Sequence, residues 1–304
     1  MTKITQCDYE RFLRSHRKVN VGGVEVRLHG RQKVTQYSPP EDYELERGTV
    51  WSFPDRGGWA THTGDYRGNW SPYIPHNLIL KFTKKGDMVL DPMVGGGTTL
   101  IECRLLGRRG IGVDINQDAI MITRDRLNFT LPNGNHIDPE IETFVGDARN
   151  LNEIEDETID LIATHPPYAK IISYTRGNIS GDLSSLPIPK YLEEIHRVAE
   201  ECIRVLKQNG HCTILVGDTR RGRHYIPLAV RVLLQFFDVG FTLKEHIIKR
   251  QWGMKSTRER WRGKKYDFYL ITHESLFIFR KPSRIEDLSK LKFSQKWWTV
   301  PTTF

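Results

Sequence analysis

The chain has 304 residues, of which 38% are hydrophobic and 27% charged, and its formal net charge is +8. This composition predicts a soluble globule with one large domain and an appended arm. No apolar run approaches the roughly 20 residues that a membrane-spanning helix needs, and the N-terminus lacks the apolar stretch of a secretory signal, so we expect a cytoplasmic protein without a membrane partner.

The cysteines and the positive charge narrow the class of protein further. Four cysteines, Cys7, Cys103, Cys202 and Cys212, show no paired spacing, so we expect reduced thiols and neither a disulfide framework nor a metal site. The excess of Lys and Arg favours a polyanionic partner such as nucleic acid, although many basic proteins bind none.

The first third of the chain divides into three segments. Residues 1–50 mix charges with glycine and proline pairs and show little periodicity, which indicates an N-terminal arm or small subdomain. Residues 51–70 are rich in aromatic, glycine and basic residues, and they are expected either to line a ligand pocket or to pack as a satellite of the core. Apolar residues at helical spacing then predict a helix over 74–82, with Pro75 in its first turn.

From residue 88 onward, strands and helices alternate, which is typical of a parallel sheet covered by helices on both faces. Strands are predicted at 88–90, 110–113, 142–145, 159–163 and 213–216, and helices at 98–106, 118–127, 190–207 and 226–237. Two final apolar runs, 241–248 and 276–279, have no convincing helix between them, so they are expected to pair antiparallel. The prediction is therefore an α/β fold with about seven strands.

A glycine-rich loop joins the first of these strands to the following helix. It reads Asp91-Pro-Met-Val-Gly-Gly-Gly-Thr-Thr99, and its glycines let the backbone approach a ligand while helix N–H groups point toward that ligand. Asp114 ends the next strand about 20 residues on, where a carboxylate can accept hydrogen bonds from ribose hydroxyls. These features predict a nucleoside-binding turn.

Two further positions bear on which nucleoside binds. Gly146-Asp147-Ala148 follows a predicted strand and either places a carboxylate near an adenine amino group or forms an ordinary turn. Leu100 stands where the dinucleotide fingerprint has its third glycine, and this disfavours a nicotinamide cofactor.

A second motif, His165-Pro166-Pro167-Tyr168, follows the apolar run 159–163. This motif and the glycine loop resemble those of the S-adenosylmethionine-dependent amino-methyltransferases that act on DNA, the family that makes N4-methylcytosine and N6-methyladenine. In that family the loop reads Asp-Pro-Phe-x-Gly-x-Gly-Thr-Thr, from which Met93 is the departure here. The family's catalytic turn begins with Asp, Asn or Ser, and here it begins with His165.

The resemblance covers roughly residues 51–282 and implies a Rossmann-like, seven-stranded methyltransferase fold with a mostly parallel sheet and an antiparallel closing strand. It also implies S-adenosyl-L-methionine as the cofactor. The segment Asn69-Trp70-Ser71-Pro72 resembles the motif that packs beside the cofactor just before the glycine loop. The implied cofactor-binding residues are Trp70, Ser71, Pro72, Asp91, Pro92, Met93, Gly95, Gly97, Thr98, Thr99, Asp114, Ile115, Asp147 and Ala148.

A mechanism follows from what an exocyclic amine requires. Its lone pair is delocalised into the ring, so the nitrogen becomes nucleophilic only if acceptors draw its hydrogens out of the ring plane. The carbonyl of Pro166 is one acceptor, because the prolines 166 and 167 cannot join a ladder, and the imidazole of His165 is the second while it is neutral. Activity should therefore fall below the pKa of His165. Tyr168 is expected to stack on a base that has left the duplex.

Two basic segments are expected to hold the nucleic acid. One is an insertion at about 249–272, where basic residues alternate with tryptophans, and the other follows the strand that ends at Val216. The residues expected to contact nucleic acid are Arg220, Arg221, Arg223, Lys249, Arg250, Trp252, Lys255, Arg258, Arg260, Trp261 and Arg262. A solvated loop whose aromatic rings pack on the core is the alternative for the insertion.

The leading hypothesis is a DNA amino-methyltransferase, the modification enzyme of a restriction system, with a catalytic domain at 51–282 and a C-terminal tail at 283–304. Cytosine N4 is slightly favoured over adenine N6, because His165 is uncharged at neutral pH, as Ser is in cytosine enzymes. Cytosine C5 methylation is disfavoured because the chain has no cysteine in a Pro-Cys loop. An RNA base amino-methyltransferase and a non-catalytic nucleic-acid-binding protein with the same fold are the alternatives.

Overall fold

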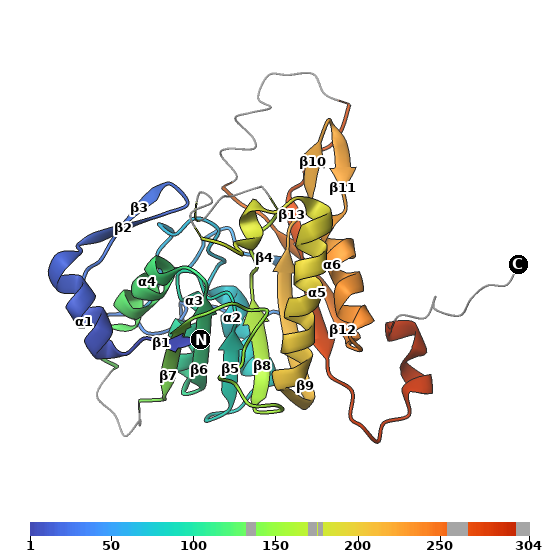
Figure 1. The fold of residues 1–304 in the computed structure, drawn as a ribbon, viewed down its shortest axis with the longest axis horizontal. Coiled ribbons are helices and arrows are strands. Elements are labelled where there is room, and N and C mark those ends of the chain that lie inside the picture. Colours follow the sequence, from blue (N-terminus) through green and yellow to red (C-terminus); the bar gives the residue numbers. More distant parts are fainter. Residues whose placement is uncertain (132–137, 170–174, 176–178, 254–266, 296–304) are drawn as a thin grey trace, which may run out of the picture.

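The computed structural model describes residues 1–131, 138–169, 175, 179–253 and 267–295. Within these residues the main sheet has nine strands in the order β1-β7-β6-β5-β8-β9-β13-β12-β4 (Figure 1). Seven of them are the predicted strands: β5 (Met88–Asp91), β6 (Arg109–Asp114), β7 (Ile141–Val145), β8 (Ile159–Thr164), β9 (Leu206–Val216), β12 (Thr242–Arg250) and β13 (His273–Arg280). The predicted α/β fold with a seven-stranded core is confirmed.

Two short strands at the edges, β1 (Thr2–Lys3) and β4 (Val50–Ser52), extend the sheet. Strands β7, β6, β5, β8 and β9 run parallel to one another, whereas β13 is antiparallel to both β9 and β12. The expected antiparallel closing pair is therefore confirmed. Because the carboxyl ends of β5, β6, β7 and β8 meet at one edge, ligand-binding groups are brought together there.

Five helices cover the two faces of this sheet: α2 (Tyr73–Phe82), α3 (Thr98–Leu106), α4 (Gln117–Leu127), α5 (Ile188–Val205) and α6 (Leu228–Asp238). Alternate residues of each central strand point to opposite faces. Leu90 and Ile162 pack in the core beneath α5 and α6, whereas Val89 and Leu161 pack against α2. The predicted helices lie within two residues of the observed bounds.

Helix α3 packs unusually close to β6 because β6 has glycines where the helix crosses it. A Cβ atom at Gly112 would lie only 2.6 Å from Cδ1 of Leu100, and one at Gly110 would lie 2.9 Å from Cδ2 of the same leucine. The helix therefore rests almost on the strand backbone, and this fixes the position of the loop that precedes α3.

The first fifty residues, expected as an arm or small subdomain, extend from one edge of the sheet to the other. Residues 1–30 lie along the β7 edge, whereas Glu46 N donates to Asn77 of α2 at 2.8 Å and Val50 pairs with β12 at the opposite edge. Residues 1–30 contain α1 (Gln6–Ser15) and the hairpin of β2 (Lys18–Val21) and β3 (Val24–Arg27). Strand β1 pairs with β7, and the hydroxyl of the fully buried Tyr9 donates to Asp125 of α4 at 2.6 Å. This segment thus packs against α4 and continues the main sheet.

The aromatic segment 51–70 divides between the two expected roles. Trp51, Phe53 and Trp59 are buried in the core beside α2. The carboxylate of Glu102 in α3 anchors the segment, because it accepts a hydrogen bond from Trp59 Nε1 at 2.7 Å and bonds His62 Nε2 at 2.8 Å. The same carboxylate bonds His76 Nδ1 of α2 at 2.7 Å. The end of the segment, from Tyr66 onward, belongs to the cavity described below.

The remaining elements lie at the periphery. Strands β10 (Thr219–Arg221) and β11 (His224–Ile226) form a two-stranded hairpin that projects beyond the main sheet (Figure 1). Short 3-10 helices occur at Leu183–Ser185 (η1) and Leu288–Ser294 (η2). All four cysteines are free thiols. Among the described residues there is no cluster of metal-ligating side chains, and no helix has the length and apolar character to cross a membrane.

Candidate active site

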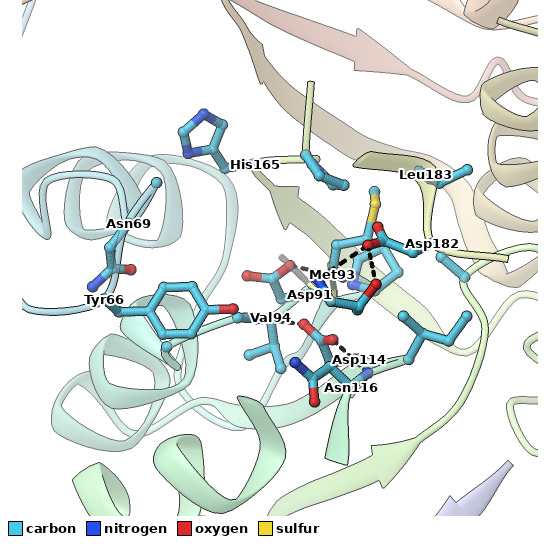
Figure 2. Close-up of a pocket in the computed structure, with 18 of the residues that line it drawn as sticks. Tyr66, Asn69, Asp91, Met93, Val94, Asp114, Asn116, His165, Asp182 and Leu183 are labelled. Carbon is cyan, nitrogen blue, oxygen red and sulfur yellow. Dashed lines mark hydrogen bonds between the residues drawn. The ribbon is translucent and has the colours of Figure 1, made fainter. Parts of the chain in front are cut away.

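A cavity opens at the carboxyl ends of β5, β6, β7 and β8, and Figure 2 shows the side chains around it. It is lined by Tyr66, Gly68, Asn69, Trp70, Asp91, Pro92, Met93, Val94, Gly95, Gly96, Asp114, Ile115, Asn116, Asp147, Ala148, His165, Pro167, Thr175, Gly181, Asp182 and Leu183. The glycine loop and the first residue of the His-Pro-Pro-Tyr turn therefore face one space. Figure 2 shows His165 at one end of it, with Asp114 and Asn116 at the other.

Asp91, the last residue of β5, organises the glycine loop. Its carboxylate accepts hydrogen bonds from Met93 N at 3.2 Å, Thr99 Oγ1 at 2.6 Å and Thr164 Oγ1 at 2.8 Å. Burial raises the pKa of Asp91 to about 6, and the two threonine hydroxyls oppose part of that rise. One side chain thus joins the loop to the helix that follows it and to the end of β8.

Asp114, the last residue of β6, supports the loop from the neighbouring strand. Its two carboxylate oxygens accept from Gly95 N at 3.0 Å and from Asn116 N at 2.9 Å. Burial raises the pKa of Asp114 to about 6, and the nearby carboxylates of Asp91 and Asp182 add to the rise. A ligand that donates hydrogen bonds or carries positive charge would favour the ionised form of this group.

Asp182 was not predicted from the sequence, yet its carboxylate shapes one wall of the cavity. It accepts from Ser184 N at 2.8 Å, Ser184 Oγ at 2.7 Å and Thr175 Oγ1 at 2.6 Å. The only local signal is an Asp two residues before a Ser, which is common at turns. Among the described lining residues four are aspartates and none is Lys or Arg, so the cavity suits a cationic ligand.

The opposite wall comes from the end of the aromatic segment. The ring of Tyr66 lies against the glycine loop, where a Cβ at Gly95 would be 3.1 Å from Cε1 of that ring. Asn69 accepts a hydrogen bond from Thr98 Oγ1 at 2.6 Å, which ties this wall to the start of α3. Tyr66 and Asn69 were not among the individually predicted cofactor-binding residues, although pocket lining was one of the two roles expected for the aromatic segment and Asn69 begins the motif expected beside the cofactor.

Most of the predicted cofactor-binding residues meet at this cavity. Its lining includes Trp70, Asp91, Pro92, Met93, Gly95, Asp114, Ile115, Asp147 and Ala148, whereas Ser71, Pro72, Gly97, Thr98 and Thr99 lie outside it. Two of the outer residues hold lining residues in place, because Thr98 bonds Asn69 and Thr99 bonds Asp91, whereas Ser71 Oγ donates to the carbonyl of Arg56, which does not line the cavity, at 2.7 Å. Asp147 pairs with Arg149, whose Nε donates to it at 2.8 Å.

At the other end, His165 and Pro167 of the turn line the cavity. The imidazole of His165 stacks on Trp70 with the ring centroids 5.9 Å apart, and its Nε2 lies 2.6 Å from Tyr168 Oη. The Tyr168 hydroxyl also donates to Glu274 Oε1 at 3.0 Å. Tyr168, expected to stack on a target base, thus directs its hydroxyl toward two buried side chains.

The predicted nucleic-acid contacts occupy different environments. Arg221 is exposed on the hairpin, whereas Arg220 donates to the carbonyl of Tyr269 at 2.9 Å and Arg223 to Asp267 at 2.7 Å. Lys249 is mostly buried, because its ammonium bonds Glu274 Oε2 at 2.9 Å. Arg250 lies over the ring of Trp252, 4.2 Å from its centroid, and Trp252 is 40% exposed. Lys255, Arg258, Arg260, Trp261 and Arg262 lie outside the described residues.

Comparison with protein families gives two matches. A sequence model described as DNA methylase matches residues 14–125 and 159–303, which is most of the chain and extends beyond the 51–282 of the expected resemblance. A second model, described as an RMKL-like methyltransferase domain, matches residues 79–207.

Individual relatives match shorter stretches. A tRNA (guanine(10)-N2)-dimethyltransferase of Methanothermobacter thermautotrophicus is 32% identical over 132 residues, 43% of this chain and 35% of its own. The Type II methyltransferase M2.DpnII of Streptococcus pneumoniae is 47% identical over 55 residues, 18% of this chain and 20% of its own. M.MthZI of Methanothermobacter thermautotrophicus, also a Type II methyltransferase, is 28% identical over 155 residues, 45% of this chain and 44% of its own. This chain thus spans less than half the length of each of these relatives.

Proposed function

This chain belongs to the DNA methylase family, and from that premise we propose that it transfers a methyl group from S-adenosylmethionine to an exocyclic amino group of a base in DNA. The observation that carries the proposal is that His165 lines the same cavity as Asp91 and Asp114. A methyl donor held by the carboxylate end and an amine held at His165 would share one enclosed space.

S-adenosylmethionine is the cofactor, and the cavity lining suits it. Its sulfonium and ammonium groups are cationic, which the lining carboxylates of Asp91, Asp114 and Asp182 complement, since Asp147 is already paired with Arg149. Its ribose hydroxyls can donate to Asp114. A dinucleotide would instead bring a pyrophosphate, for which no described lining residue supplies Lys or Arg. When bound, S-adenosylmethionine would supply an electrophilic methyl group with S-adenosylhomocysteine as the leaving group, and the methylated amine would release one proton.

The His-Pro-Pro-Tyr turn would activate the amine. The carbonyl of Pro166 accepts one amine hydrogen and the unprotonated nitrogen of His165 accepts the other, so that the nitrogen lone pair is released from the ring and can be aimed at the methyl group. Burial lowers the pKa of His165 to about 4, with the Lys249 ammonium acting in the same direction and the Glu274 carboxylate and Gly68 carbonyl opposing it. The imidazole is therefore neutral at physiological pH, as an acceptor must be.

For the target, we favour cytosine N4 over adenine N6, because the first side chain of the turn is uncharged. The base would leave the duplex to reach the cavity, and the exposed Arg221 and Arg250 would contact the nucleic-acid backbone beside it. A role as the modification enzyme of a restriction system rests on the similarity to the Type II methyltransferases.

RNA is the second candidate substrate, and one observation favours it. The relatives include tRNA (guanine(10)-N2)-dimethyltransferases from Methanothermobacter thermautotrophicus and Methanocaldococcus jannaschii, the latter 40% identical over 108 residues. Those enzymes are named for methylation of an exocyclic amine in tRNA, so the same arrangement of acceptors would serve either nucleic acid.

The test is to incubate the purified protein with methyl-labelled S-adenosylmethionine and, separately, with duplex DNA and total RNA. Each nucleic acid is then digested and the labelled nucleoside identified by mass spectrometry. Label in N4-methylcytosine or N6-methyladenine from DNA supports the proposal and names the base. Label from RNA alone transfers the proposal to RNA, and binding of the cofactor without any labelled product would mean that the fold serves a non-catalytic protein.

A further inference from the structure

Four side chains from three parts of the fold form one hydrogen-bonded row beside the cavity. His165 and Tyr168 come from the turn after β8, Glu274 from β13 and Lys249 from β12. His165 Nε2 lies 2.6 Å from Tyr168 Oη, which lies 3.0 Å from Glu274 Oε1, and Glu274 Oε2 lies 2.9 Å from Lys249 Nζ. The side chains of His165, Glu274 and Lys249 are 14%, 7% and 16% exposed, so bulk water does not compete for these bonds.

The charge at one end of the row sets the direction of its hydrogen bonds. Burial alone would raise the pKa of Glu274, but the Lys249 ammonium and the hydrogen bond from the Tyr168 hydroxyl hold it below its usual range. An ionised carboxylate can only accept, so the Tyr168 hydroxyl proton points to Glu274. The Tyr168 oxygen then has only lone pairs to offer His165, and the proton between these two groups must come from Nε2 of the imidazole.

The other ring nitrogen is then the one that lacks a proton. His165 Nδ1 is buried and makes no hydrogen bond of full geometry within the described part of the chain, although the Gly68 carbonyl lies close enough to the imidazole to raise its pKa. A proton on the ring nitrogen that faces this carbonyl is the competing form, and the spectra described below distinguish the two. A buried polar atom without a partner costs free energy, and a ligand that donates a hydrogen bond would remove that cost. His165 already lines the cavity in which we place the target amine.

We propose that Glu274, held by Lys249, is a positioning residue that acts through Tyr168 to fix His165 as the Nε2–H tautomer, which leaves Nδ1 as the acceptor for the amine of the target base. The identity of that amine rests on the proposed function, whereas the tautomer is a property of the protein alone. In this family the turn more often begins with Asp, Asn or Ser, whose side-chain oxygens accept without a tautomer to fix. A histidine at this position offers an acceptor only in one of its two neutral forms.

The tautomer can be measured without any substrate. Long-range 1H–15N correlation spectra distinguish Nε2–H from Nδ1–H imidazole, and a His165→Gln variant identifies the His165 signals among the 11 histidines. We expect Nε2–H for His165 in the unaltered protein. In Glu274→Gln an amide N–H can face Tyr168, which lets the tyrosine proton turn toward Nε2, so we expect the Nδ1–H tautomer. An Nδ1–H tautomer in the unaltered protein, or an unchanged tautomer in Glu274→Gln, would overturn the proposal.

Kinetic measurements provide a second test of the proposal. Because a positioned acceptor typically contributes about 10²- to 10⁴-fold to rate, Glu274→Gln should lower kcat about 10²-fold while cofactor affinity stays the same. If Glu274 acts through Tyr168, adding Glu274→Gln to Tyr168→Phe should lower kcat almost no further. If the two residues act independently, the losses in kcat of the two single variants should multiply in the double variant. The matched control is Glu245→Gln, the same exchange on β12 outside the row.

The spectra and the kinetic measurements together distinguish failure of this proposal from failure of the proposed function. If the protein methylates no nucleic acid, the spectra still decide whether Glu274 sets the tautomer. Should Glu274→Gln not fold, Tyr168→Phe alone breaks the row, and a mixture of His165 tautomers in that variant is the expected result. A single Nε2–H tautomer in Tyr168→Phe would show that the row does not set it.

Discussion

The two ends of the cavity are built in different ways. At the carboxylate end most hydrogen-bond partners are close in sequence: Thr99 bonds Asp91 across 8 residues and Gly95 bonds Asp114 across 19, whereas Thr164 bonds Asp91 across 73. At the other end Tyr168 bonds Glu274 across 106 residues, and the link exists only because β13 and β12 pair beside β9. The proposed cofactor binding thus depends mostly on a local loop, whereas the proposed activation of the target depends on the assembled sheet.

The comparison predicts that the two ends can be disabled separately, and the largest effect is expected at His165. His165→Ala removes one of two acceptors for the target amine, so we expect kcat to fall by about 10²- to 10⁴-fold. Binding of S-adenosylmethionine, measured by calorimetry, should stay nearly unchanged because the aspartates remain in place. Unaltered turnover in this variant would remove His165 from the mechanism, and a parallel loss of cofactor affinity would mean that the ends are not separate.

The reciprocal change is Asp114→Ala, with a smaller expected effect. Hydrogen bonds to a charged group contribute about 1.5–3 kcal/mol, so loss of this carboxylate should weaken cofactor binding by about 10- to 100-fold. Turnover at saturating cofactor should stay close to that of the unaltered protein. A kcat defect that saturating cofactor does not restore would show that Asp114 also serves the chemical step. Glu10→Ala on the exposed face of α1 is the control.

The two ends should also respond to pH in different ranges. The pKa values of Asp91 and Asp114 are raised to about 6, so below pH 6 these groups gain protons and lose their attraction for a cationic cofactor. Because each carboxylate loses about 5-fold of its ionised fraction over this range, the Kd for S-adenosylmethionine should rise by up to about 30-fold from pH 6 to pH 5. His165, with its pKa lowered to about 4, stays neutral in this range, so kcat at saturating cofactor should fall only as the pH approaches 4.

Titrations of Kd and kcat in the same buffers check this prediction. A kcat that falls together with cofactor affinity between pH 6 and 5, although cofactor is saturating, would show that His165 titrates near its ordinary pKa.

The smallest expected effect is outside the cavity. Arg221→Ala on the hairpin should weaken nucleic-acid binding a few-fold and reduce the slope of log Kd against log salt concentration by about 0.9, the value for one phosphate contact. Arg14→Ala, which removes an exposed arginine from α1 along the β7 edge, is the matched control and should leave the slope unchanged. Equal slopes for Arg221→Ala and the unaltered protein would exclude this phosphate contact.

The same contrast explains how much could be predicted from the sequence. The glycine loop and the His-Pro-Pro-Tyr turn are short contiguous motifs that can be found in the sequence alone, and the structure brings both to one cavity. The seven core strands were also predictable, because each has a run of apolar residues. The edge strands β1 and β4 were not, because two or three residues are too few to show a pattern.

Other residues could not be identified because their roles depend on distant partners. Glu274 stands second in a strand that reads His-Glu-Ser-Leu-Phe-Ile-Phe-Arg, and a charged residue among apolar ones is a weak signal until the strand is known to be buried. The role of Lys249 was also not visible in the sequence. Because it lies within a basic segment, it was predicted to contact nucleic acid, and only the pairing of β12 with β13 places its ammonium beside Glu274.

The position of the β10–β11 hairpin has a consequence for the design of variants. Its strands pair with each other through three residue pairs and stand apart from the main sheet. A surface appendage of this kind tolerates insertions and exchanges, because its length does not alter the register of β9 with β13. If the hairpin contacts nucleic acid as proposed, exchanging it for another hairpin would alter that contact and leave the residues of the cavity unchanged.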